Sequence, residues 1–239
     1  MSRPIKIMVI NPNSSKMMSQ LIEHTAKKYA SSETQIIVTT STMTPETIED
    51  YIDYVKASEE VIQRITEGSK YGVDAYVIAC YDDPGLYAGR QLVEVPVVGV
   101  AEASMLYAVI LGQKFTFITI SDRGVHSIEE LVERYGFSKR CASIRAVSAH
   151  VRDLLADRDW ALREAEREAI EAVRLDGAEV IILGCTGWTG VDKLLEEKIG
   201  VPVVDGVVAA VKLVEGLVSY GKKTSKVWSF KHPSYVGGR

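Results

Sequence analysis

The chain has 239 residues, of which 46% are hydrophobic and 25% charged, and its 28 Lys and Arg against 32 Asp and Glu give a formal net charge of −4. This composition is typical of a globular protein and supplies no basic surface for nucleic acid. No apolar run reaches the roughly 18 residues of a membrane span and the start has no signal-peptide core, so we expect a cytoplasmic protein without nucleic-acid or membrane partners.

Short β-branched runs alternate with helical patterns along the whole chain. The predicted strands cover residues 7–10, 35–39, 75–79, 97–100, 115–120, 180–183 and 201–204. The predicted helices cover residues 56–67, 102–111, 160–174 and 207–220, with one more beginning near Lys16. Because parallel strands need crossover connections and helices supply them, the pattern predicts an α/β fold with mostly parallel sheets.

The order of these elements repeats in the two halves. The strand 75–79 ends at Cys80, and Pro96 of a Val-Pro-Val-Val strand follows 16 positions later. The strand 180–183 is followed by Cys185, and Pro202 of a second Val-Pro-Val-Val strand follows 17 positions later. The repeat predicts two pseudo-symmetric parallel-sheet lobes with the active site between them.

An apolar helix follows each Val-Pro-Val-Val strand and is suited to cross between the lobes. We therefore expect residues 1–100 together with 207–239 to form the first lobe and residues 101–206 the second. The segment after Tyr220 has no periodic pattern but carries Trp228, Phe230 and Tyr235. We expect it to be an arm that packs on a neighbouring subunit.

The three cysteines are expected to be free thiols in a reducing cytosol. Cys80 and Cys185 fall at the carboxyl ends of predicted parallel strands, where ligands of such sheets collect. Two thiols facing each other across a cleft suit proton exchange at a stereocentre, because one removes a proton from one face and the other returns a proton to the opposite face. Cys141 has no counterpart in the other half and is interpreted as an incidental thiol.

The loops around the two thiols supply the candidate substrate-binding residues, which are Asn13, Ser14, Tyr81, Asp82, Ser121, Thr186 and Gly187. Asn13 and Ser14 lie in a loop that either caps the next helix or directs backbone N–H groups at an anion. Asp83 is either a proton-transfer group or a cap of the following helix. The segment 41–46 is either a lid or a surface loop. The four histidines are scattered and no C-x-x-C spacing occurs, so no metal is expected.

Three motifs carry a resemblance to a known family. They are Asn11-Pro12-Asn13-Ser14, Cys80-Tyr81-Asp82-Asp83-Pro84-Gly85-Leu86 and Leu183-Gly184-Cys185-Thr186-Gly187. With them the chain resembles the aspartate/glutamate/hydantoin racemase superfamily, and within it the hydantoin and allantoin racemase branch. The resemblance implies that Cys80 and Cys185 are proton donor and acceptor, that no metal or other cofactor takes part, and that the enzyme is a homo-oligomer acting on a small molecule.

The residues beside the thiols depart from the amino-acid racemases of that superfamily. Those tend to carry Cys-Asn-Thr and Cys-Thr-His, whereas this chain has Cys80-Tyr81-Asp82 and Cys185-Thr186-Gly187. The departure points away from free glutamate or aspartate. The resemblance implies 5-monosubstituted hydantoins, whose ring oxygens would be held by Asn13 and the amides after each thiol, or allantoin. The other readings are an amino-acid racemase, a maleate isomerase-like enzyme and a non-catalytic two-lobe binding protein. The presence of both thiols argues against an arylmalonate decarboxylase.

Overall fold

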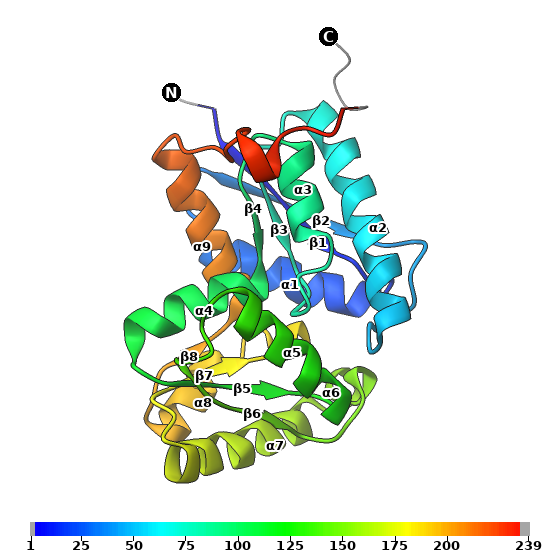
Figure 1. Cartoon of the computed structure of the whole chain (residues 1–239). Helices are drawn as coiled ribbons and strands as arrows, with labels where there is room; N and C mark the ends of the chain where they lie inside the picture. Colours follow the sequence, from blue (N-terminus) through cyan, green and yellow to red (C-terminus); the bar gives the residue numbers. More distant parts are fainter. Residues whose placement is uncertain (1–2, 235–239) are drawn as a thin grey trace.

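A computed structural model describes residues 3–234 as two four-stranded parallel sheets, one above the other in Figure 1. The strands are β1 (Ile5–Asn11), β2 (Thr34–Thr40), β3 (Ala75–Ile78), β4 (Val97–Gly99), β5 (Phe115–Thr119), β6 (Cys141–Ala146), β7 (Val180–Leu183) and β8 (Val203–Val204). The first sheet has the order β2-β1-β3-β4 and the second the order β6-β5-β7-β8. The two orders are the same when each strand is matched to the one four places later, so the predicted duplication is confirmed.

Helices connect the parallel strands, as the alternation in the sequence predicts. They are α1 (Lys16–Tyr29), α2 (Tyr51–Gly68), α3 (Leu86–Leu92), α4 (Val100–Leu111), α5 (Asp122–Arg134), α6 (Val151–Ala156), α7 (Arg158–Glu171), α8 (Asp192–Ile199) and α9 (Gly206–Ser219). Within residues 3–234, every helix falls short of the length or apolar character that a membrane span requires.

The sequence analysis does not predict β6, which runs along the edge of the second sheet. All six of its residues are partly exposed, and its pairing with β5 is irregular next to Phe115. An edge strand that buries neither face fully shows no clear alternation of apolar and polar residues, and this explains why the pattern is missed. β6 is the counterpart of β2, and Cys141 is its first residue.

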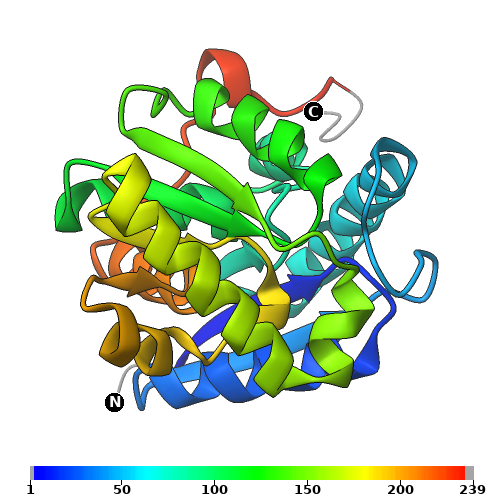
Figure 2. The same ribbon diagram turned by 90° about the horizontal axis from the view of Figure 1, so that it is seen from below.

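Each sheet is covered by helices on both faces. In β1, Ile7 and Val9 pack in a cluster with α1 and α9, whereas Met8 and Ile10 pack in another with α2 and α3. The second sheet is arranged in the same way, with α7 beneath it and α5 above it in Figure 1, and the view from below confirms that these helices lie on opposite sides (Figure 2). Strands buried on both faces read as continuous apolar runs, which is why both central pairs are recognised from sequence.

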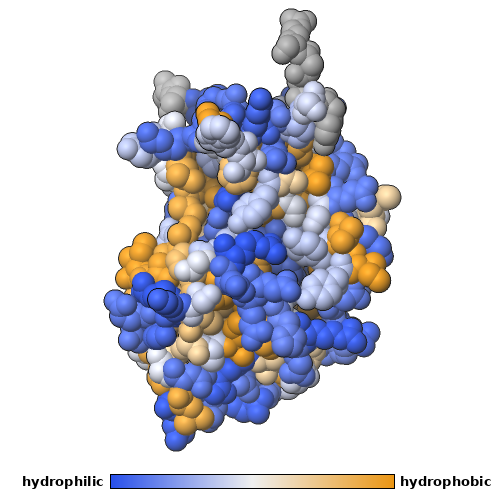
Figure 3. Space-filling view, viewed as in Figure 1, coloured by the Kyte–Doolittle hydropathy of each residue, from blue (hydrophilic) through white to orange (hydrophobic). Residues whose placement is uncertain are grey.

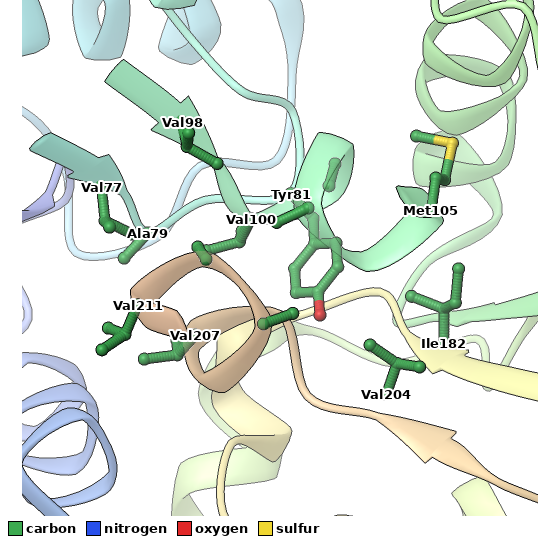
Figure 4. Close-up of a cluster of buried hydrophobic side chains, with 14 of the residues drawn as sticks. Val77, Ala79, Tyr81, Val98, Val100, Met105, Ile182, Val204, Val207 and Val211 are labelled. Atoms are coloured by element: carbon green, nitrogen blue, oxygen red, sulfur yellow. The ribbon is translucent and has the colours of Figure 1, made fainter. Parts of the chain in front are cut away.

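Helices α4 and α9 join the two sheets through one continuous core. α4 leaves β4 of the first sheet and packs on α9 and on β7 of the second, and α9 returns from β8 to contact α1 and β3. Figure 4 shows side chains of this core, which come from both sheets and both helices and include Val77, Val98, Ile182, Val204 and Val211. The exact lobe boundaries stay a prediction, but these crossings hold the carboxyl ends of both sheets toward each other.

The segment after α9 packs on its own chain through residue 234. Thr224 donates its backbone N–H to the carbonyl of Glu94 (2.7 Å), and the ring of Phe230 lies 6.0 Å from that of Tyr87 on α3. Phe230 thus has an aromatic partner on α3, whereas Trp228 is 88% exposed, and the expected packing of this segment on a neighbouring subunit stays a prediction. Tyr235 lies outside the described residues.

Candidate active site

The loops after four strands meet at one cavity. β1 and β3 are the central strands of the first sheet and β5 and β7 those of the second, and their carboxyl ends lead to Asn13, Cys80, Ser121 and Cys185. All four residues line a cavity of about 410 Å³. The structure therefore brings both predicted catalytic thiols into one site at the position where parallel α/β sheets bind ligands.

Cys80 is flanked by a carboxylate from its own loop. Its Sγ lies 3.8 Å from Oδ2 of Asp82, at hydrogen-bonding distance for sulfur, and Oδ1 of Asp82 accepts a hydrogen bond from the hydroxyl of Ser127 on α5. Burial raises the pKa of the Cys80 thiol well above its ordinary value, and the negative charge of Asp82 raises it further. Cys80 therefore favours its protonated form.

Cys185 has a different partner. Its Sγ accepts the backbone N–H of Gly187 at 3.3 Å, within the short helical turn Thr186–Trp188. Burial raises the pKa of Cys185 to about 12, while the Gly187 N–H acts in the opposite direction by stabilising the thiolate. Negative charge on Cys185 also raises the pKa of Cys80, so ionisation of one thiol opposes ionisation of the other.

Arg158, which is not among the residues predicted from sequence, holds the loop that follows Cys185. The guanidinium, at the first position of α7, donates hydrogen bonds to the carbonyl oxygens of Gly187 (2.7 Å) and Thr189 (3.1 Å). Burial lowers the pKa of Arg158. An arginine among the many charged residues of an amphipathic helix gives no signal of this role, because only the folded chain brings it to the loop.

Asn13 presents a fixed amide to the cavity. Its Oδ1 accepts hydrogen bonds from the side chain of Asn11 (2.9 Å) and the backbone N–H of Ser15 (3.0 Å), which fix the side chain of this cavity-lining residue. Ser15 caps α1 through the N–H of Met18, so the predicted capping role of this loop is confirmed. Ser14 is not among the residues that line the cavity, and its N–H binds the carbonyl of Pro45 at 3.0 Å.

Tyr81 lines the cavity, but its hydroxyl does not point at a ligand. The oxygen accepts the backbone N–H of Gly206 at 2.8 Å and a hydrogen bond from Ser104 at 3.3 Å, and the side chain is buried. Figure 4 shows the hydroxyl directed toward the start of α9, between Val207 and Val204. The ring therefore forms part of the wall while the hydroxyl fixes the beginning of a helix that joins the two sheets.

The remaining predicted binding residues divide between the cavity and its support. Ser121 lines the cavity and also caps α5 by accepting the N–H of Gly124 at 3.3 Å. Thr186 lines the cavity as well. Gly187 is not among the lining residues, and its backbone N–H donates to Sγ of Cys185. Both Ser121 and its counterpart Ser15 thus begin helices whose N-termini face the site.

Asp83 is a helix cap, but of a different helix from the one expected. Its carboxylate accepts the N–H groups of Ala101 (3.1 Å) and Glu102 (2.9 Å) at the start of α4, and the hydroxyl of Tyr135 at 2.8 Å. Burial raises the pKa of Asp83 to about 7. The following helix α3 begins instead at Gly85, which has a left-handed conformation and no side chain to cap with. Asp205 caps α9 in the corresponding place of the second half.

The outer part of the cavity is formed by residues that sequence reasoning missed. The segment 41–46 is not part of the lining, and its place is taken by Ile48, Glu49, Asp50, Tyr51 and Tyr54 at the start of α2. Tyr51, Ile52 and Val55 are all exposed, and Figure 3 shows apolar surface over α2 on the right of the molecule. From α5 come Arg123, His126, Ser127, Glu130 and Arg134, at helical spacing. Among residues 3–234, no three His, Cys, Asp or Glu side chains are grouped as metal ligands.

The sequence matches the Asp/Glu/hydantoin racemase family over residues 7–214. The chain belongs to this family. It is 44% identical over 236 residues to a hydantoin racemase of Pseudomonas sp. (strain NS671), covering 98% of this chain and 95% of that protein. The solved structure of an allantoin racemase from Klebsiella pneumoniae is similar with a TM-score of 0.94 and 37% identity, covering 96% of this chain and 94% of that one.

More distant members of the family share the fold alone. Glutamate racemase RacE1 from Bacillus anthracis superimposes with a TM-score of 0.64 at 14% identity, covering 92% of this chain and 84% of that one. The predicted two-lobe α/β racemase fold is therefore confirmed. Membership of the family also confirms an isomerase of the racemase type, in preference to a binding protein without chemistry.

Proposed function

We propose that this racemase inverts C5 of 5-monosubstituted hydantoins with Cys80 and Cys185 as a pair of acid–base groups. The observation that carries the proposal is that both thiols line one cavity, each at the end of an equivalent strand, β3 in one sheet and β7 in the other. Racemisation needs a base on one face of the stereocentre and an acid on the other. Two equivalent thiols from opposite sheets meet that need.

The chemistry requires one thiolate and one thiol at a time. The thiolate removes the C5 proton, the electron pair of the broken C–H bond moves onto the adjacent ring carbonyl as an enolate, and the other thiol gives its proton to the opposite face. The two cysteines have then exchanged protonation states, and turnover in the reverse direction or exchange with water restores them. Nδ2 of Asn13 and the backbone N–H groups that follow each thiol stabilise the enolate oxygen as it forms.

The wall of the cavity supports a bulky apolar group on C5. Ile48, Tyr51 and Tyr54 from the first half approach Leu131 and Val151 from the second. An aromatic or branched aliphatic substituent would bury apolar area against these side chains, and each fully buried group of that kind contributes roughly 1.5–3 kcal/mol. The hydantoin racemase relative at 44% identity supports the same class of substrate.

Allantoin is the second candidate substrate. The allantoin racemase structure that superimposes with a TM-score of 0.94 favours it, and allantoin shares the hydantoin ring. Its 5-substituent is a polar ureido group, which needs hydrogen-bond partners in place of an apolar wall. The charged side chains of α5 at the outer part of the cavity, such as Arg123 and Glu130, could supply them.

The test follows enantiopure 5-benzylhydantoin and enantiopure allantoin in deuterated buffer by optical rotation and by deuterium at C5, after subtraction of the uncatalysed rates. We expect rotation to decay with deuterium uptake, faster for 5-benzylhydantoin. Cys80→Ser and Cys185→Ser are each expected to abolish racemisation while retaining exchange from one enantiomer. Cys141→Ser is the matched control, because Cys141 lies on β6 and does not line the cavity.

Three outcomes would contradict the proposal in different ways. Faster turnover of allantoin than of 5-benzylhydantoin would identify allantoin as the preferred substrate. Full racemisation by either active-site serine variant would exclude the two-thiol mechanism. No change in either substrate beyond background would exclude both hydantoin derivatives and favour an amino-acid racemase or a maleate isomerase-like enzyme. Independence from cofactors, a cytoplasmic location and homo-oligomer formation stay predictions.

A further inference from the structure

The two thiols are equivalent in the duplicated fold, but their surroundings are not. A carboxylate oxygen of Asp82 lies 3.8 Å from Sγ of Cys80, so the Cys80 S–H has an acceptor. A backbone N–H of Gly187 lies 3.3 Å from Sγ of Cys185, so the sulfur of Cys185 has a donor. The backbone N–H of Asp82 lowers the pKa of Cys80 as that of Gly187 lowers the pKa of Cys185, so the difference between the two thiols is the carboxylate acceptor at Cys80. An acceptor stabilises the thiol form and a donor stabilises the thiolate form. The same proton transfer therefore has different energies on the two sides of the cavity.

Ser127 sets the charge and position of Asp82. Its hydroxyl, on α5 beside the second sheet, donates to Oδ1 of Asp82, whose backbone belongs to the loop after β3 of the first sheet. Burial raises the pKa of Asp82, whereas the hydrogen bonds from Ser127 and Cys80 lower it, so the hydroxyl of Ser127 favours the ionised carboxylate against the effect of burial. The bond also spans the two halves, so Asp82 is held against Cys80 when the halves are together. Both carboxylate oxygens of Asp82 thus have partners within the protein.

From these contacts we propose that Asp82 is a positioning residue, held by Ser127, that keeps Cys80 as the proton donor, so that the first proton lost by the pair comes from Cys185. This rests on the two-thiol mechanism proposed above and adds an order to it. Asp82 lines the cavity, so its predicted contact with substrate stays a prediction, and the role proposed here is exerted through Cys80. The enantiomer whose C5 hydrogen faces Cys185 then meets the enzyme form that already carries the thiolate.

The test measures the reactivity of each thiol without substrate. Iodoacetamide alkylation is followed at several pH values between roughly 7 and 10, and each cysteine is quantified by peptide mass spectrometry. Cys80 is measured in the Cys185→Ser protein and Cys185 in the Cys80→Ser protein, each with and without Asp82→Asn. Cys141 reports in every sample as an internal reference, because it lies on β6 away from the cavity.

Removal of the Asp82 charge is expected to lower the pKa of Cys80 by about one unit or more. A pKa that is lower by one unit raises the thiolate fraction of Cys80 about tenfold. Because a thiolate of lower pKa is also a weaker nucleophile, the net alkylation of Cys80 is expected to be about threefold faster. Cys185 is expected to change less, because the charge of Asp82 raises its pKa without a hydrogen bond to its sulfur, and Cys141 is expected not to change. Asp159→Asn, which removes an exposed carboxylate on α7, is the matched control and is expected to leave all three rates unchanged.

Ser127 provides a second, independent variant in case Asp82→Asn unfolds. Ser127→Ala is expected to accelerate alkylation of Cys80 by a smaller factor than Asp82→Asn, and Ser127→Thr, which keeps the hydroxyl, to restore the original rate. A merely structural role would change the melting temperature without changing the ratio of Cys80 to Cys141 alkylation. An unchanged ratio in the folded variants, or equal acceleration of Cys80 and Cys185, would overturn the proposal.

These outcomes are separable from those of the racemase assay, because alkylation needs no turnover. Thiols that respond unequally in a protein without racemase activity would refute the proposed function and leave the asymmetry standing. Thiols that respond equally in an active racemase would refute the asymmetry alone.

Discussion

Substitution of Tyr81 by Phe separates two roles for this residue, which lies directly after the thiol of Cys80. The sequence suggests substrate binding, whereas in the structure the hydroxyl accepts the N–H of Gly206 at 2.8 Å. Phe keeps the ring in the cavity wall and removes only the oxygen. The buried N–H at the start of α9 then loses its partner, at a cost of about 1–3 kcal/mol in the free energy of unfolding.

The expected change can be measured directly. For a chain of this size, a loss of 2 kcal/mol lowers the melting temperature by about 4–8 °C. Urea unfolding followed by circular dichroism gives the free energy, and kcat/KM for 5-benzylhydantoin gives the catalytic effect. Because the hydroxyl points away from the cavity, we expect kcat/KM to stay within a factor of about three, which corresponds to less than 1 kcal/mol.

The matched control is Tyr29→Phe, at the end of α1, whose side chain is partly exposed and contacts lysine side chains through the face of its ring. It is expected to leave both measurements unchanged. The reasoning would be refuted if Tyr81→Phe kept its stability but lost most of its activity, since the hydroxyl would then be bound to the substrate. Loss of both would show that the beginning of α9 also sets the geometry of the site.

Three further predictions follow from the same geometry. Burial raises the pKa of both proposed catalytic thiols, to about 12 for Cys185, so the thiolate fraction grows as the pH rises toward that pKa. We therefore expect kcat/KM to rise about tenfold per pH unit between roughly pH 7 and pH 9. A flat profile over this range would contradict the prediction. Arg158→Ala removes two hydrogen bonds to the loop after Cys185. It is expected to lower the free energy of unfolding in urea by about 1–3 kcal/mol and to lower kcat/KM about tenfold. Arg158→Lys lacks the planar guanidinium and is expected to recover only part of the stability and of the activity. Gly99→Ala would place a Cβ 2.1 Å from the carboxyl carbon of Asp83 and is expected to destabilise the protein by about 3 kcal/mol in urea unfolding. The control is Gly216→Ala on α9, whose added Cβ has no atom within 4 Å. It is expected to be neutral or to stabilise the protein by up to about 1 kcal/mol.

The central part of the fold and the two thiols can be predicted from the amino-acid pattern alone. Strands buried on both faces are continuous apolar runs, and they are short enough to be distinguished from helices. The repeated strand, cysteine and Val-Pro-Val-Val pattern required no coordinates, because duplication preserves order along the chain. These features account for the first sheet, for the second sheet apart from its edge strand β6, for the crossing helices and for the position of Cys80 and Cys185.

The roles of the side chains next to the thiols depend on contacts that form only when the chain folds. Tyr81, Asp82 and Asp83 are consecutive in sequence, yet their polar atoms have partners in different parts of the fold. The hydroxyl of Tyr81 binds the start of α9. The carboxylate of Asp82 binds Cys80 and α5, and that of Asp83 binds the start of α4. Arg158 reaches the Cys185 loop across 29 positions of sequence. Periodicity reports which face of an element is buried, but a hydrogen bond between distant segments depends on how the elements pack. The local pattern therefore determines where the site lies, and the packing of the two halves determines which groups act in it.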